Sequence, residues 1–341
     1  MPISLTELKN EFGTYIATAQ KEILKRLTQK TESMKYMKTI ASKDLEHRTA
    51  HAVIDNLVQG FQKGFTPKGT ATFTPLTIVQ RRHKIDMSFY PDDIVESWIG
   101  FLADEGKSRE DWPITKYVID ELVIPKVEEN RELLLIGKGV YAAPVTGVAQ
   151  NTGKSMDGFC TILENEAADP ATQVNFFDGG EAGPMTKENI VEFIEEFVDW
   201  ISELYQGIPM NIYLAPSWFR AYKRNFRETY GADNDFNGAT QVILDSNKKL
   251  IALPSMAGTD IVFCTPKENF IRLTNTNEGA SNIEVQADVR QILIFGDWHE
   301  SVGFGMAEAI FAYVPDISGS TSASPSPSAS LSPSASVSPS V

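Results

Sequence analysis

Cysteine is scarce in this chain, which contains only Cys160 and Cys264 in 341 residues. They stand far apart, and neither belongs to a Cys-x-x-Cys pair or to a cysteine–histidine spacing. A disulfide framework needs several cysteines and a structural zinc site needs four ligands, so the pattern argues against both. We expect two buried free thiols.

Long apolar runs are missing as well. No segment approaches the roughly eighteen apolar residues of a membrane-spanning helix, and the first residues, MPISLTELKNEF, are charged and amphipathic, unlike a secretion signal. Apolar residues nevertheless make up 42% of the chain, which is enough for a large core in one domain or two. The sequence therefore predicts a globular, cytosolic product.

The last 24 residues lack charge altogether. From Ser318 to Ser340 every even-numbered position is serine, and alanine and proline fill most of the positions between. Proline removes backbone donors that a strand needs, and the stretch has too little apolar surface to offset its ordering entropy. We predict a disordered Ser/Pro/Ala-rich tail over 318–341, which is either an inert leftover or a displayed surface brush.

Positive charge is concentrated at one end of a chain whose net charge is −14. Residues 1–90 hold 14 Lys and Arg against 8 Asp and Glu, whereas the rest of the chain holds 17 against 37. A basic arm on an acidic body either binds nucleic acid or lies on the body of another copy. The modest excess, without any zinc-finger spacing, is weak support for direct DNA binding.

The first ninety residues predict two helices and an extended arm. Ser4 and Glu7 form a capping box, and apolar residues then recur every three or four positions as far as Leu27, which indicates an amphipathic helix. A second helix is expected over roughly 43–60. Residues 61–90 are rich in Thr, Phe, Ile and Val between Gly and Pro, so we predict an extended arm with a hairpin. We interpret its charges as a solvated or intersubunit face; they are Arg81, Arg82 and Lys84.

A long helix is predicted from Pro113 to Gly137, after a short one in PDDIVESWIGFLA. Pro125 removes a backbone hydrogen bond in its middle, so a kink or break is expected. After a Gly-rich connection, Thr186 is expected to cap an amphipathic helix. Strand patterns then dominate, with one helix at SWFRAYKRNFRETY. They are NIYLAP, QVILD, KLIALP, DIVFC, NFIRL, SNIEVQA, RQILIFG and AEAIFAYV. This order predicts an α+β fold without a regular βαβ rhythm.

The segment GVAQNTGKS has the residue types of a P-loop, in which backbone amides and a lysine hold phosphates. Five residues separate Gly147 from Gly153 where the motif has four. No firm strand precedes Lys154 and Ser155 and no immediate helix follows, because Gly158 interrupts SMDGFC. The spacing therefore argues against nucleotide binding.

Two further segments suggest chemistry only in part. DNDFNG, residues 233–238, matches the first half of a calcium loop, but Leu244 stands where the bidentate glutamate should be, and an ordinary Asx-rich turn is the alternative. In GDWHES, Asp297 and His299 would share a strand face and could form a dyad, yet no nucleophile signature accompanies them and a structural histidine is favoured.

The remaining histidines, His47, His51 and His83, lie in the basic arm, where His47 and His51 could share a helix face. No cysteine partners accompany them, so a zinc site is not indicated. We assign no catalytic, cofactor-binding or metal-ligating residue and expect no cofactor.

The chain resembles the major capsid proteins of tailed double-stranded DNA phages, which have the Hong Kong 97-type capsid fold, and most closely those of crAss-like and other Bacteroidetes phages. The likeness spans about residues 80–315. It rests on the stretches RRHKIDMSFYPDDIVESWIGFLA, DWPITKYVIDELVIPKV, NIYLAPSWFRAYKRNFRETYG, LIALPSMAGTDIVFCTPKENF and VRQILIFGDWHESVGFGMAEAIFAYV. None of them is a catalytic motif.

The resemblance implies a division of the chain into domains. These are an N-terminal arm (1–60), an extended E-loop (61–90), a peripheral P domain with the long helix (91–139 and 281–317), an axial A domain (140–280) and the tail (318–341). It also implies a structural protein, not an enzyme, that assembles into the hexamers and pentamers of an icosahedral head.

The implied partners are other copies, a separate scaffolding protein, a portal and other head proteins, and packaged double-stranded DNA without sequence specificity. No membrane is implied. The protein would be made and assembled in the cytoplasm of the bacterial host and would end in the virion. Two alternatives remain open: an encapsulin-like compartment of the same fold, and a P-loop or metal-dependent enzyme.

Overall fold

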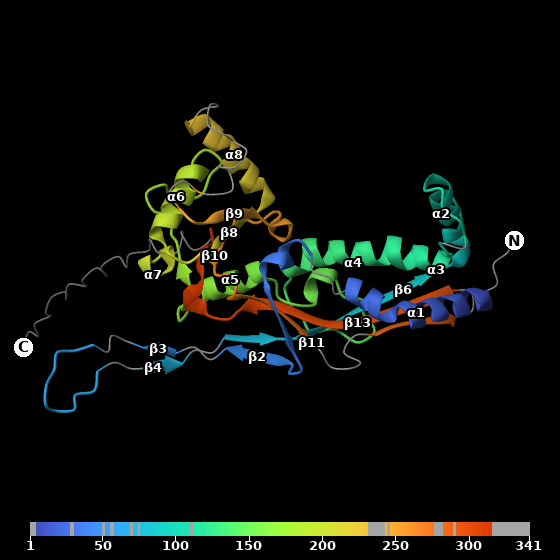
Figure 1. Ribbon diagram of the computed structural model, residues 1–341, viewed down its shortest axis with the longest axis horizontal. Helices are drawn as coiled ribbons and strands as arrows, with labels where there is room; N and C mark the ends of the chain where they lie inside the picture. The colour runs from blue at the N-terminus through green and yellow to red at the C-terminus, as the bar shows by residue number, and fades with distance from the viewer. Residues whose placement is uncertain are drawn as a thin grey trace, which may run out of the picture.

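The computed structural model describes residues 5–27, 31–49, 52–54, 58–68, 71–73, 76–109, 112–230, 243, 246–275, 282–288 and 291–315. Within these residues the chain forms two five-stranded mixed sheets and two short two-stranded ribbons. Figure 1 shows an elongated part, built on the first sheet, with a helix-covered lobe at one end of it. The predicted α+β class is confirmed.

The first sheet has the strand order β1–β11–β13–β12, with β6 paired to β13 as well. The bounds are β1 Lys38–Ser42, β6 Arg81–Phe89, β11 Phe270–Asn275, β12 Asn282–Asp288 and β13 Gln291–Phe304. Helix α1 (Leu5–Leu27) and a long helix from Ile114 to Ile136 run along this sheet, and α2 (Pro91–Asp104) stands at its far end (Figure 1). Apolar side chains of α1, α2, the long helix and the sheet form one core between them, including Phe12, Trp98, Val118 and Ile292.

The second sheet, in the lobe, has the strand order β7–β14–β10–β8–β9. The bounds are β7 Asn175–Phe176, β8 Asn211–Leu214, β9 Lys249–Ala252, β10 Val262–Thr265 and β14 Phe311–Tyr313. Helices α6 (Ile190–Trp200) and α8 (Pro216–Tyr230) share a core with one face of this sheet, α7 (Glu203–Gln206) lies beside α6, and the other face shares a core with α5 (Phe159–Ala168).

The predicted helix over 43–60 is wrong. Two strands lie there, β2 (Glu46–Thr49) and β3 (Ala52–Ile54), and they pair antiparallel with β5 (Leu76–Val79) and β4 (Ala71–Phe73). Cross-strand pairing, which a local pattern does not reveal, overrides the helical spacing. The hairpin predicted within 61–90 thus has its first strands in the segment before it. His47 lies on β2 rather than on a helix, and His51 is outside the described residues.

The long helix is continuous across Pro125. It consists of α3 (Ile114–Tyr117), a π-helical turn (Val118–Val123), α4 (Ile124–Asn130) and a second π-helical turn (Arg131–Ile136). The Ile124 N–H donates to the carbonyl of Ile119, five residues back. The helix is therefore already widened at the turn where proline lacks a donor and needs room. Of the predicted kink or break, the break is not observed.

Two further predictions need correction. The sequence does not predict helix α5, because Gly158 interrupts SMDGFC; in the structure Gly158 is the extended residue just before the helix. The helix expected to be capped by Thr186 begins at Ile190 with Asn189 at the N-cap, and Thr186 closes the preceding turn by donating from Oγ1 to Asn189 Oδ1 (2.9 Å). QVILD lies largely outside the described residues, and the tail 318–341 and residues 233–238 lie wholly outside them.

Two glycines allow the end of the long helix, the start of α5 and the turn at Pro254–Met256 to pack backbone to backbone. A Cβ on Gly137 would lie 2.2 Å from the Ser255 carbonyl oxygen, and a Cβ on Gly158 would lie 2.4 Å from the carbonyl of Gly137. The Gly158 N–H also donates to Gly139 O (2.8 Å), and Cys160 N–H to Gly137 O (2.9 Å). This crossing joins the lobe to the elongated part.

Gly158→Ala is expected to lower the free energy of unfolding by about 1–3 kcal/mol, because the added methyl group meets backbone that cannot rotate away. The matched control is Gly100→Ala in α2, where a Cβ meets nothing within 4 Å. That change should raise stability by up to about 1 kcal/mol, because alanine favours a helix. Urea unfolding of both variants tests the pair, and equal stabilities would contradict the packing described.

Candidate functional site

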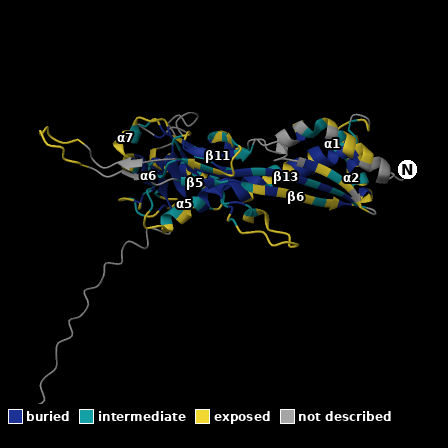
Figure 2. Ribbon diagram, turned by 90° about the horizontal axis from the view of Figure 1, so that it is seen from below, coloured by how far each residue is buried: buried dark blue, intermediate teal, exposed yellow. Residues whose placement is uncertain are grey.

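The tip of the long hairpin, residues 58–68, carries apolar side chains that the rest of the described chain does not cover. Phe61 is 96% exposed, Phe65 94% and Val58 90%. Figure 2 shows the tip in yellow, standing away from the body. Hydrogen bonds across the tip close the loop, from Lys68 Nζ to Val58 O (2.7 Å) and from Gln59 Nε2 to Thr66 O (2.8 Å).

Leaving a phenylalanine in water forgoes roughly 1.5–3 kcal/mol compared with burying it, so two of them at one tip mark a contact surface. We did not single out these residues from the sequence. The signal that could have found them is the repeated Gly-Phe in GFQKGF, which places two large apolar residues among polar ones and without helical or strand periodicity.

A buried ion cluster fastens the long helix to the first sheet. Glu300 of β13 is 0% exposed, and its carboxylate accepts hydrogen bonds from Arg131 Nε (3.0 Å) and Nη2 (2.8 Å) and from Arg272 Nε (2.6 Å). Burial alone would raise the pKa of Glu300, but the guanidiniums of Arg131 and then Arg272 lower it to about 2. The carboxylate is therefore ionised, and it is held by two cations from different elements.

His83 of β6 adjoins this cluster. Its Nδ1 lies 3.0 Å from Ser155 Oγ and its Nε2 lies 3.0 Å from the Glu300 carbonyl oxygen, while the ring stacks on Trp298 at a centroid distance of 5.4 Å. Burial lowers the pKa of His83, so the neutral ring is favoured. His83 therefore holds the loop of Ser155 on the sheet, a structural role that the sequence indicated for His299 and not for His83.

A third polar link ties the same helix end to the lobe. Ser33 Oγ donates to Glu132 Oε1 (2.5 Å) and lies 2.6 Å from Ser255 Oγ, and all three residues are buried. The last turn of the long helix therefore carries two anchors, Arg131 toward the first sheet and Glu132 toward the lobe. Movement of the helix end would have to break both sets of buried bonds.

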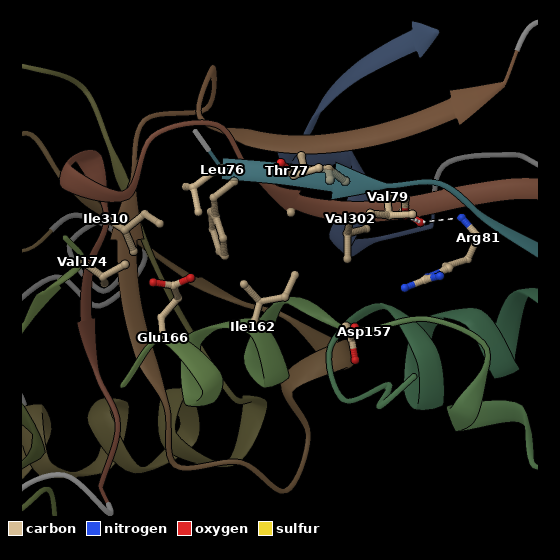
Figure 3. A pocket seen from close by; sticks show the side chains of 14 residues that line it. Leu76, Thr77, Val79, Arg81, Asp157, Ile162, Glu166, Val174, Val302 and Ile310 are labelled. Atoms are coloured by element: carbon tan, nitrogen blue, oxygen red, sulfur yellow. Dashed lines mark hydrogen bonds between the residues drawn. The ribbon is translucent and has the colours of Figure 1, made fainter. Parts of the chain in front are cut away.

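A cavity of about 180 Å³ lies between the root of the hairpin, the end of β13 and α5. Figure 3 shows Asp157 and Glu166 at separate places along it, with Ile162 between them. Each carboxylate already accepts a bond from its own chain: Asp157 Oδ1 from Tyr141 N–H (2.8 Å) and Glu166 Oε2 from Thr172 Oγ1 (2.8 Å). The walls are mainly aliphatic, so the arrangement packs the hairpin root rather than converging on a reacting atom.

The P-loop-like segment is not arranged as a phosphate cradle. Thr152–Lys154 form one short 3₁₀ turn, the Gly153 N–H donates to Asn151 Oδ1 (3.3 Å), and the Lys154 N–H donates to Asn151 O (3.0 Å). The amides that would hold a phosphate are thus turned toward their own loop.

The other candidates from the sequence also have ordinary surroundings. Asp297 and His299 share the half-buried face of β13, as predicted, and Asp297 Oδ2 accepts from Arg82 Nη2 (2.9 Å). Cys160 and Cys264 are buried free thiols, as predicted, and burial raises the pKa of Cys264 to about 12. Within the described ranges no group of three or more His, Cys, Asp or Glu is placed to hold a metal ion, and no helix is long and apolar enough to cross a membrane.

The basic arm is largely engaged with its own chain. On α1, Phe12 is fully buried with its ring 5.8 Å from that of Phe89, and Tyr15 donates to Asp120 Oδ2 (3.2 Å). The three charges predicted as a solvated or intersubunit face are exposed or half-buried and meet local groups. Arg81 lies over the ring of Tyr141, Arg82 pairs with Asp297 and Lys84 pairs with Asp86.

No protein-family model matches the chain, and no curated protein matches it. Solved structures do match. A chain of the satellite phage P4 procapsid, in a structure that includes the size determination protein Sid, has a TM-score of 0.56 at 11% identity, covering 91% of this chain and 97% of that one. A chain from the capsid of an empty GTA particle has a TM-score of 0.50 at 9% identity, covering 82% and 87%. The chain has the Hong Kong 97-type capsid fold that the sequence predicted.

Proposed function

We propose that the chain is a major capsid protein that self-assembles into the icosahedral head around a double-stranded DNA phage genome. The observation that carries the proposal is the projecting hairpin, whose tip leaves Phe61 and Phe65 almost wholly exposed on a chain with a capsid fold. A neighbouring copy that covers the tip would bury this surface, and obligate contacts of that kind are apolar and extensive. No catalytic role is proposed.

We assign the E-loop, the P domain and the A domain from the pairing of the strands. The E-loop corresponds to the hairpin of 46–79 and not only to 61–90, because β2 and β3 form its first strands. The P domain contains the first sheet, including β11 (270–275), and the A domain contains the second sheet, including β14 (311–313). This proposal assigns β11 to the P domain and β14 to the A domain, whereas the resemblance implied an A domain over 140–280 and a P domain segment over 281–317.

The partners follow from the same proposal. Other copies form hexamers and pentamers; a separate scaffolding protein, a portal and other head proteins complete the head; and packaged DNA is held without sequence specificity. Assembly takes place in the host cytoplasm and ends in the virion. The likeness of the sequence stretches supports a phage of the crAss-like or Bacteroidetes branch.

Electron microscopy of the purified full chain, expressed alone and with candidate scaffolding protein, tests the function. Uniform closed shells are expected. Small oligomers that turn over a nucleotide would contradict the proposal and favour an enzyme. Shells that copurify with a defined cargo protein, and that do not take up DNA in the presence of portal and packaging proteins, would favour an encapsulin-like compartment instead.

We further propose that the neutral ending, Ser318–Val341, lies on the outer surface. Inside a filled shell it would occupy volume without gaining phosphate contacts, because it has no Lys or Arg. A chain ending at Ile317 is expected to assemble and package DNA, and a tag after Val341 to bind antibody on intact particles. A tag detected only after the shells are broken open would place the ending inside.

A further inference from the structure

Helix α6 presents a row of carboxylates to solvent. Glu192, Glu195, Glu196 and Asp199 follow the spacing i, i+3, i+4, i+7, which places them on one side of a helix. The opposite side is apolar and buried on the second sheet; it comprises Ile190, Val191, Phe193, Ile194, Phe197 and Val198. The row is therefore the outer side of α6, and we call it the acidic stripe.

Helix α8 presents the opposite charge with the same spacing. Arg220, Lys223, Arg224 and Arg227 again follow i, i+3, i+4, i+7, opposite a buried side formed by Ala221, Tyr222, Asn225 and Phe226. We call this row the basic stripe. It stands out on a chain with a net charge of −14.

The two stripes are neighbours on one outer surface of the lobe. Asn225 of α8 joins the helices, since its Oδ1 accepts from Val191 N–H (3.1 Å) and its Nδ2 donates to Glu188 O (2.6 Å). Figure 1 shows both helices on the lobe, away from the first sheet. A surface with an acidic and a basic row of equal spacing is complementary to a second copy of itself.

Much of this charge has no counter-ion among the residues that the structure describes. Arg220 and Arg224 are exposed and make no ion pair with any described residue, and their one hydrogen bond joins Arg224 Nε to the Arg220 carbonyl (3.4 Å). Glu192 and Asp199 are likewise exposed and unpaired among the described residues. These four charges are thus available to an outside partner, in contrast to Arg82 and Lys84, whereas Glu195 already accepts from the Tyr230 hydroxyl and Glu196 from the Ala182 N–H.

We infer that this surface is an interface between copies of the chain, in which the basic stripe on α8 of one copy lies against the acidic stripe on α6 of another. The inference rests on the proposed function and names the surface that orients one copy on the next. Complementary potentials favour that register, and juxtaposed like charges disfavour others. The matched spacing allows several pairs to form together.

Nucleic acid is the alternative partner for the basic stripe, and the acidic stripe argues against it. Because the two helices are in contact, a phosphate backbone lying along α8 would also approach the carboxylates of α6. Salt screens such charges only beyond roughly 8–10 Å. Repulsion would then offset much of the attraction. A second copy presents both signs and avoids this conflict.

A charge exchange tests the inference. The variant Arg220→Glu/Arg224→Glu cancels the positive charge of the basic stripe by placing two carboxylates in it, and Glu192→Lys/Asp199→Lys cancels the negative charge of the acidic stripe by placing two ammonium groups in it. Each is expected to raise the concentration needed for self-association at least about tenfold, measured by sedimentation velocity of the full chain at low and high salt. The variant with all four changes gives the new carboxylates on α8 new ammonium groups on α6 as counter-charges and keeps the original net charge, and it should return to within about threefold of the wild type.

The four-change variant is the matched control, because it contains every substitution of the other two. Circular dichroism and thermal melting should be unchanged in all three, since the residues are exposed. Undisturbed association in both double variants would overturn the inference while leaving wild-type shells, and so the proposed function, intact. Failure of the four-change variant to recover would also overturn it.

Two outcomes separate the remaining possibilities. If Arg220→Glu/Arg224→Glu associates normally but loses binding to a short DNA duplex, the stripe binds nucleic acid and the inference is wrong. If the wild-type chain stays monomeric at every concentration, both the inference and the proposed function fail.

Discussion

Replacing Glu300 with glutamine is expected to lower the free energy of unfolding by about 3–5 kcal/mol. The change keeps the shape of the side chain but removes the carboxylate charge that the buried guanidiniums of Arg131 and Arg272 both bind. A charge that has been taken out of water and lost its partner is far more costly than an exposed pair that is broken. Urea unfolding followed by tryptophan fluorescence gives the value.

The matched control is Asp297→Asn on the same strand. Asp297 pairs with Arg82, whose side chain is 64% exposed, so its loss should cost less than about 1 kcal/mol. Equal effects for the two variants would contradict a role for the buried cluster in holding the long helix. A Glu300→Gln chain that also fails to form shells, while Asp297→Asn forms them, would link the cluster to the position of that helix.

The same cluster sets a dependence of stability on pH. The pKa of Glu300 is about 2 in the folded chain and near 4.3 when unfolded, so its contribution is present above the higher value and is lost as the pH falls toward 2. The contribution of His83 to stability is lost at a higher pH than that of Glu300. Burial lowers the pKa of His83 in the folded chain, whereas the unfolded chain takes up a proton on this residue below about pH 6.5. The wild type should lose stability in both windows, whereas Glu300→Gln should be flatter below about pH 4.

Local patterns predicted the elements whose stability is decided locally. Helices α1, α2 and α8 have apolar residues at helical spacing, and α2 has Pro91 at its first turn, so each begins and ends close to where the sequence indicates. The spacing of the charged residues in the two stripes can also be read from the sequence, in EFIEEFVD and RAYKRNFR. Only the structure shows that both rows face away from the same sheet.

Features that depend on distant partners were not predictable in the same way. Arg131 and Glu300 are 169 positions apart, and nothing near either residue marks it as buried. Strands β2 and β3 are strands because β5 and β4 pair with them, and the start of α5 at Gly158 depends on the backbone of Gly137. In each case long-range packing, not local propensity, decides the outcome.

Replacing Phe61 and Phe65 together with serine is expected to abolish shell formation at concentrations where the wild type assembles. Each ring is at least 94% exposed in the single chain, so its removal costs the folded chain little. In a shell, each would be an apolar anchor in a neighbour, and an anchor of this kind contributes about 2 kcal/mol or more, roughly thirtyfold in the concentration needed per site. Light scattering and electron microscopy during assembly measure the effect.

The matched control is Gln62→Ser/Lys63→Ser, which alters the same tip between the two phenylalanines but removes no large apolar surface. It should assemble within a few-fold of the wild type, and thermal melting of the unassembled chains should agree across all three proteins. Normal shells from Phe61→Ser/Phe65→Ser would mean that the exposed rings are not covered by a neighbour. The exposure of the hairpin tip would then no longer support the proposed function. If only the phenylalanine variant loses shell formation, and its melting temperature is unchanged, then the apolar tip stabilises the assembled shell without stabilising the fold of the single chain.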